Sequence, residues 1–155
     1  MKKELYIIAN NIRSLHNVGS IFRTADALGA AKVYLTGYTG APPDPKIAKV
    51  ALGAENFVPW EKEKSATRLI KKLKTQNPRL RVAALENNVK RKTIPLSKYR
   101  PRFPLALIVG EEVRGVSKPL LALADDIIEI PMRGKKESLN VSVALGIAAY
   151  QLLNE

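Results

Sequence analysis

The fold of this chain depends most on residues 135–144, Lys135-Lys-Glu-Ser138-Leu-Asn140-Val-Ser-Val-Ala144. This stretch places a polar Glu-Ser-x-Asn cluster directly before a long apolar segment, which predicts a helix over about 139–153. Because that helix has few polar residues to make a solvent face, it needs cover on all sides, as a core helix would have. Ser138 and Asn140 stand at its start, where free backbone N–H groups favour partial negative charge and could hold a ligand. Ser138 could also serve as an ordinary N-cap.

Short apolar runs elsewhere in the chain predict buried strands. They are rich in Val, Ile, Leu and Tyr, most are followed by Gly, Asn or Pro, and they span Leu5–Ala9, Lys32–Thr36, Leu80–Leu85, Leu105–Val109 and Ile127–Ile130. Helical patterns lie between them: apolar residues at helical spacing begin at Ala66, and Gly29 closes a helix that starts at about Val18. Alternating strands and helices predict an α/β fold, a mostly parallel sheet with helices on both faces.

Polar segments follow several of these predicted strands. They are 10–17, 86–87, 110–115 and 131–138. Open parallel sheets bind ligands beyond the carboxyl ends of their strands. We therefore expect these four loops to meet at one place.

Composition limits the class of protein and its partners. The chain has 155 residues, 46% of them hydrophobic, with no tandem repeat and no composition step, so we expect one domain over 1–155 without an additional RNA-binding domain. It has no cysteine, no early segment long enough for a signal sequence and no run that would span a membrane, so we expect a cytoplasmic protein. The formal net charge of +12 favours a polyanionic partner, nucleic acid above all, although a solvated basic surface is the alternative.

Two further segments carry polar residues without an obvious folding role. They read Asn17-Val-Gly-Ser-Ile-Phe-Arg23-Thr-Ala-Asp26-Ala-Leu-Gly29 and Gly110-Glu-Glu112-Val-Arg114-Gly115-Val-Ser117. The glycine spacing of the second resembles a phosphate-binding P-loop, but Val116-Ser117 replaces the Lys-[Ser/Thr] pair, which argues against an ATPase. A nucleotide-dependent oxidoreductase is also disfavoured, because no G-x-G-x-x-G turn follows the first strand.

Together, the cores N-x-G-x-x-x-R-T-x-D, G-x-E-x-x-G-x-S and S-L-N-V-S resemble, in this order, the three motifs of the SpoU/TrmH family of RNA ribose 2′-O-methyltransferases, within the SPOUT class. The resemblance implies a C-terminal trefoil knot, the cofactor S-adenosylmethionine and methyl transfer to a ribose 2′-hydroxyl of tRNA or rRNA. It also implies a homodimer built partly on the last helix, and no metal. The alternative function is a non-catalytic RNA-binding protein that retains the fold.

The resemblance also implies the site residues. The catalytic set would be Arg23, Asn17, Glu112, Ser138 and Asn140, and the cofactor would lie against Leu85, Gly110, Ile130, Met132, Ser138 and Leu139. Taken without the resemblance, several of these residues have simpler roles: Asn17 would cap the Val18 helix, and Arg23 would pair with Asp26. Glu112 could hydrogen-bond ribose hydroxyls or orient Arg23. His16, the single histidine, lacks a carboxylate partner in the sequence pattern, and we leave it outside the set.

A basic middle segment is the candidate RNA-binding surface. We expect Lys90, Arg91 and Lys92, together with Arg114, to contact phosphates, and the interleaved Tyr99 and Phe103 could stack on an exposed base. A solvated loop is the alternative.

Overall fold

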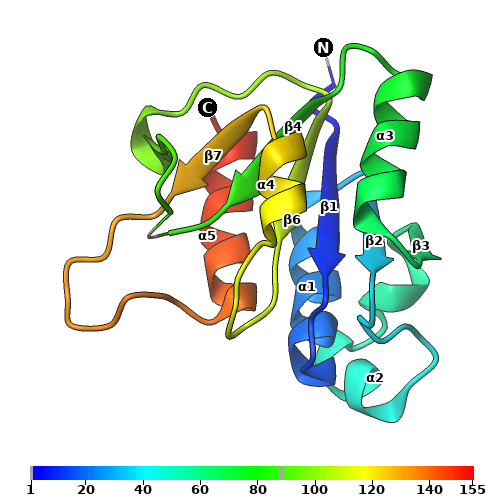
Figure 1. Cartoon of the computed structure of the whole chain (residues 1–155). Helices are drawn as coiled ribbons and strands as arrows, with labels where there is room; N and C mark the ends of the chain where they lie inside the picture. Colours follow the sequence, from blue (N-terminus) through cyan, green and yellow to red (C-terminus); the bar gives the residue numbers. More distant parts are fainter. Residues whose placement is uncertain (1, 88) are drawn as a thin grey trace.

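Within residues 2–87 and 89–155, which the computed structural model describes, seven strands form one sheet in the order β3-β2-β1-β6-β4-β7-β5 (Figure 1). Every pair of neighbouring strands is parallel. The strands are β1 Leu5–Asn10, β2 Lys32–Thr36, β3 Trp60–Glu63, β4 Arg81–Leu85, β5 Ile94–Pro95, β6 Leu105–Val109 and β7 Asp126–Glu129. The mostly parallel α/β sheet predicted from the sequence is confirmed.

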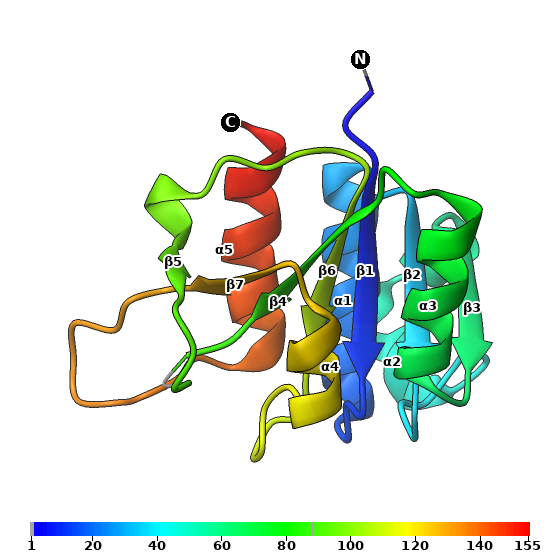
Figure 2. The ribbon, with the colours of Figure 1, turned by 45° about the horizontal axis from the view of Figure 1, so that its top comes forward.

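Helices cover both faces of this sheet (Figures 1 and 2). The helices are α1 Leu15–Leu28, α2 Pro45–Ala51, α3 Ala66–Gln76, α4 Lys118–Leu123 and α5 Val141–Leu153, with short 3-10 turns η1 Ala54–Asn56 and η2 Leu96–Lys98. Buried side chains of α1, α2 and α5 pack on one face of the sheet, and those of α3 and α4 pack on the other. The sheet is therefore the centre of a three-layer core that presents its strand ends to the surface.

Helix α1 begins earlier than the sequence pattern predicts. Its N-cap is Ser14, whose side chain accepts a hydrogen bond from the Asn17 backbone N–H, so the prediction that Asn17 caps a helix starting at Val18 is wrong. A serine one turn earlier already supplies the cap, which leaves the Asn17 amide free for other contacts. The predicted end is confirmed, because Gly29 adopts the left-handed conformation with φ 69°.

Helix α5 begins at Val141, later than the predicted start at 139. Its N-cap is Asn140, whose side-chain oxygen accepts hydrogen bonds from the Ser142 and Val143 N–H groups. Ser138 lies two residues before the cap, so its predicted alternative role as an ordinary N-cap is wrong. Both asparagine and serine suit a cap, and the pattern alone did not distinguish them.

The pattern of apolar runs in the sequence did not predict the two edge strands, β3 and β5. Strand β3 has the sequence Trp-Glu-Lys-Glu and β5 has only two residues. A charged or very short strand is typical of a sheet edge, where it protects against pairing with another chain, and it lacks the apolar run by which interior strands are recognised. In the described part of the chain, no helix is both long and apolar enough to cross a membrane.

Candidate active site

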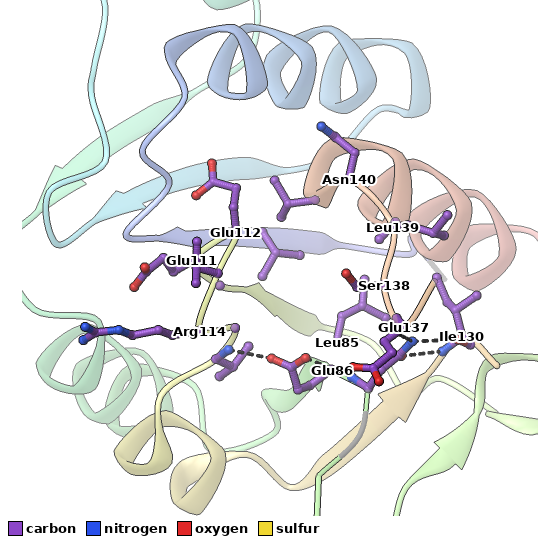
Figure 3. Close-up of a pocket in the computed structure, with 18 of the residues that line it drawn as sticks. Leu85, Glu86, Glu111, Glu112, Arg114, Ile130, Glu137, Ser138, Leu139 and Asn140 are labelled. Atoms are coloured by element: carbon purple, nitrogen blue, oxygen red, sulfur yellow. Dashed lines mark hydrogen bonds between the residues drawn. The ribbon is translucent and has the colours of Figure 1, made fainter. Parts of the chain in front are cut away.

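A cavity of about 590 Å³ opens at the carboxyl ends of β4, β6 and β7 (Figure 3). Its walls come from 85–87 after β4, 109–116 after β6 and 137–141 before α5. All the residues predicted to contact the cofactor line it: Leu85, Gly110, Ile130, Met132, Ser138 and Leu139. Three of the four predicted loops therefore meet here, and the fourth, 10–17, approaches through contacts with Glu112.

The loop after β6 is a tight turn that returns on itself. Gly115 donates its N–H to the Glu111 carbonyl at 2.8 Å, and these two residues form an antiparallel bridge. A Cβ added to Gly110 would lie 2.5 Å from the Gly115 carbonyl carbon, so no side chain fits at that position. Gly115 has φ 71°, which also favours glycine. The two glycines of this motif thus serve the shape of the cavity wall.

Glu112 joins this wall to the start of α1. Its carboxylate accepts hydrogen bonds from the backbone N–H groups of Arg13 and Ser14, each at 3.2 Å, and from the Asn17 side-chain amide at 3.3 Å. Burial raises the pKa of Glu112, but hydrogen bonds from backbone N–H groups, including its own and those of Arg13 and Ser14, outweigh it and hold the pKa below its ordinary value. Glu112 is therefore a fixed anion at neutral pH.

Asn17 extends the same network to the third motif. Its side-chain oxygen accepts a hydrogen bond from the Asn140 amide at 3.2 Å, while its own amide donates to Glu112. One residue from each of the three sequence motifs is thus joined side chain to side chain beside the cavity. Glu112 and Asn140 line the cavity, and Asn17 lies behind them at the start of α1.

Two residues after β4 were not singled out as ligand-contacting residues by the sequence reading. Asn87 donates to the Ile130 carbonyl at 3.0 Å and accepts from the Ile130 N–H at 3.3 Å. Glu86 accepts from the Val116 N–H at 2.6 Å and from the Asn87 N–H at 2.9 Å. Their position directly beyond a parallel strand was the available signal, but no known motif marked them.

Arg23 does not line the cavity. It is exposed on α1, and among the residues that the structure describes it forms no hydrogen bond or ion pair, so the predicted alternative pairing with Asp26 is wrong. Among the described residues Glu112 also forms no hydrogen bond or ion pair with Arg23; its carboxylate instead accepts from two backbone N–H groups and Asn17. The guanidinium is thus available to a ligand outside the cavity.

The predicted RNA-contacting residues lie in two places. Lys90 and Lys92 are exposed beyond β4, and the exposed Arg114 lies on the cavity wall. Arg91 is also exposed, and its guanidinium donates to the Leu121 carbonyl.

The predicted role of Tyr99 in base stacking is wrong. Tyr99 is 5% exposed, and its hydroxyl donates to Asp126 at 2.9 Å. Its ring is a packing residue, which a pattern of mixed basic and aromatic residues could not reveal. Phe103 is partly buried and packs against the core, and its stacking role stays a prediction.

No group of three or more metal-ligating His, Cys, Asp or Glu side chains occurs among the described residues. The polar groups of the cavity are instead arranged around backbone hydrogen bonds. A cavity with apolar side chains and a few fixed polar groups is typical of sites for small organic ligands.

The fold and the three joined motifs define a SpoU-type methyltransferase domain. Residues 4–150 match the SpoU rRNA Methylase family, and the chain belongs to that family. The resemblance inferred from the three motifs is thereby confirmed.

Relatives of known name extend the comparison. The chain is 31% identical to the 23S rRNA (guanosine-2′-O-)-methyltransferase of Vibrio parahaemolyticus, over 97% of this chain and 59% of the relative. It is 33% identical to the tRNA (guanosine(18)-2′-O)-methyltransferase of Aquifex aeolicus, over 97% of this chain and 69% of the relative. The SpoU methyltransferase AviRb of Streptomyces viridochromogenes, solved with AdoMet, shares the fold with a TM-score of 0.89 and 23% identity, over 99% of this chain and 61% of that one. The chain thus spans about three-fifths of the length of the V. parahaemolyticus relative.

Proposed function

We propose that this chain transfers the methyl group of S-adenosylmethionine to a ribose 2′-hydroxyl of tRNA or rRNA. The observation that carries the proposal is the network of Asn17, Glu112 and Asn140, which links the three motifs beside one cavity. A protein that only binds RNA needs basic charge but has no need for this polar cluster. Relatives named as tRNA and rRNA 2′-O-methyltransferases support the same reaction.

The cavity fits the proposed cofactor. Its volume of about 590 Å³ lies within the range of ordinary small-molecule sites, roughly 300–1,000 Å³. Leu85, Val109 and Leu139 give it apolar walls, and Ser138 is a hydroxyl-bearing residue of its lining. When bound there, S-adenosylmethionine would supply the electrophilic methyl group.

The chain itself would contribute mainly by positioning the RNA. Holding a hydroxyl in line with an acceptor carbon removes much of the entropic barrier to transfer. Arg23, exposed and without an internal partner in the described structure, would clamp a neighbouring phosphate and stabilise developing alkoxide charge. It would not act as a base, since a guanidinium stays protonated in proteins. Glu112, with a lowered pKa, is also a poor base and would act by holding α1 in place.

Phosphate contacts would supply much of the RNA affinity. The net charge of +12 favours a polyanion. Lys90, Arg91, Lys92 and Arg114 are exposed, and Arg114 also lines the cavity. Such contacts weaken as salt rises, because bound counterions are released when they form.

A homodimer is part of the proposal. Helix α5 buries Leu145, Ala148, Ala149 and Leu152 in its own chain, yet its other side leaves an apolar stripe exposed. The stripe consists of Val143, Ile147 and Tyr150, which are 49%, 44% and 61% exposed. Apolar residues grouped along one helix face favour a protein interface. The core-helix reading therefore accounts for only half of α5, and a second copy would cover the rest.

We also propose, from membership of the family, that the C-terminal segment threads a loop and forms a trefoil knot. The match over residues 4–150 supports a single catalytic domain over 1–155, and the RNA substrates named for the relatives support a cytoplasmic location.

Mapping of 2′-O-methylated nucleotides in total RNA from cells with and without this protein tests the proposal. We expect one or a few sites to lose their methyl group when the protein is absent. Unchanged 2′-O-methylation, together with salt-sensitive RNA binding by the pure protein, would instead support the non-catalytic RNA-binding alternative.

A further inference from the structure

We propose that the Glu86 carboxylate binds the ribose hydroxyls of the cofactor. The inference rests on the proposed function, because it takes the cavity to be the site of an adenosyl group. It assigns a ligand to a residue that carries no family motif.

Glu86 is held in a single orientation from two sides. It directly follows β4, and one carboxylate oxygen accepts the Asn87 N–H at 2.9 Å while the other accepts the Val116 N–H at 2.6 Å. The wall of the cavity is shaped to admit it: a Cβ added to Gly115 would lie 1.9 Å from Glu86 Oε2. The carboxylate is thus fixed between the loops after β4 and β6, in the wall of the cavity (Figure 3).

Among the described residues, Glu86 uses only part of its acceptor capacity. A carboxylate offers about four acceptor positions, and the backbone N–H groups of Asn87 and Val116 use one on each oxygen. In the same part of the chain Asn87 spends both ends of its amide on the Ile130 backbone, and Glu112 accepts three hydrogen bonds from the α1 segment. Glu86 is therefore a cavity-lining carboxylate that backbone groups immobilise and that can still accept from a ligand.

The chemistry of an adenosyl group selects the ribose as the partner. Its adjacent hydroxyls are paired donors that match the two oxygens of one carboxylate. A carboxylate beyond the end of a parallel strand is also how other α/β folds bind the ribose of a nucleotide. Glu86 would repel the carboxylate of the methionyl part. The ammonium group of the methionyl part is the competing partner that an experiment must exclude.

Calorimetric titration with three ligands distinguishes the ribose hydroxyls from the methionyl ammonium as the partner of Glu86. The ligands are S-adenosylhomocysteine, its 2′,3′-dideoxy analogue, and 5′-methylthioadenosine, which keeps the ribose and lacks the amino-acid part. Hydrogen bonds to a charged group predict that wild-type protein binds the dideoxy analogue about 10- to 100-fold more weakly than S-adenosylhomocysteine. In Glu86→Ala we expect this ratio to fall to about 1, and methylthioadenosine to weaken by a similar factor.

Two further variants guard against a purely structural effect. Glu86→Gln can still accept the Val116 N–H through its carbonyl oxygen, but its NH₂ group cannot accept a ribose hydroxyl, so the discrimination between the two ligands should be reduced. Glu111→Ala, which removes another carboxylate of the same cavity, should keep it. Discrimination that persists in both Glu86 variants would overturn the proposal, as would a loss of S-adenosylhomocysteine affinity without any loss for methylthioadenosine, which would assign Glu86 to the ammonium. If wild-type protein binds none of the ligands, the proposed cofactor fails as well, so the two failures are distinguishable.

Discussion

Replacing Glu112 by Gln should destabilise the protein at neutral pH, because one side chain anchors the start of α1 to the cavity wall. The carboxylate accepts from Ser14 N–H and the Asn17 amide through one oxygen, and from Arg13 N–H through the other. A glutamine has a single carbonyl oxygen, so its NH₂ group must face at least one of these donors. Loss of such a helix-terminal contact costs about 1 kcal/mol for an exposed group, which lowers the midpoint of thermal unfolding by about 2–4 °C.

The pH dependence gives this prediction its sharpest test. The folded pKa of Glu112 is lowered, so its contribution to stability is present above the unfolded pKa and is lost as the pH falls through the folded value. The difference in midpoint between wild type and Glu112→Gln should therefore be full at pH 7, begin to narrow near the ordinary glutamate pKa of roughly 4, and close at lower pH as the folded pKa is passed. Glu111→Gln is the matched control and should show no such gap. Equal midpoints at pH 7, or a gap that persists in acid, would refute the assigned role.

Three other changes test separate parts of the account. Arg23→Ala should abolish methyl transfer while cofactor affinity measured by calorimetry stays unchanged. Arg23→Lys should restore little activity, because the point charge of an ammonium cannot replace the planar, forked guanidinium. Full activity of the alanine variant would remove Arg23 from the mechanism. Ile147→Asp should give monomers by sedimentation, because a charge buried without a partner in the dimer interface costs several kcal/mol. A wild-type protein that is monomeric at micromolar concentration would exclude the dimer. Changing Lys90, Arg91 and Lys92 together to Ala should weaken the salt dependence of RNA binding. The slope of log affinity against log salt concentration should fall in magnitude by about 0.9 for each lost contact to a duplex phosphate. An unchanged slope would mean that RNA binds elsewhere, with Arg114, Arg133, Lys135 and Lys136 as the next candidates.

The sequence predicted the interior of the fold better than its edges. The interior strands were recognisable because both faces are buried and the runs are continuously apolar, as in Leu105–Val109. Strand β3 was not, because its alternation of Glu and Lys reflects an edge position that depends on where neighbouring strands lie. Helix starts were misplaced for a local reason: several residues near each start are good caps, and only the three-dimensional path shows that Ser14 and Asn140 are used.

The candidate site shows the same limit. The motifs identified the residues of the cavity wall, but not the contacts among them. That Asn17 bridges Glu112 and Asn140 requires three segments distant in sequence to meet, which follows from strand order. The fixed position of Glu86 was missed for the complementary reason: it depends on the return of the 110–116 loop, and no pattern within its own segment indicates that return.

Transfer of labelled methyl from S-adenosylmethionine to purified tRNA and rRNA measures most directly whether this chain methylates ribose in RNA. After complete digestion of the RNA to nucleosides, we expect the label in a 2′-O-methylated nucleoside with wild-type protein and no label with Arg23→Ala. Label on a base, or no label on either RNA class despite measurable cofactor binding, would contradict the proposed methyl transfer to ribose.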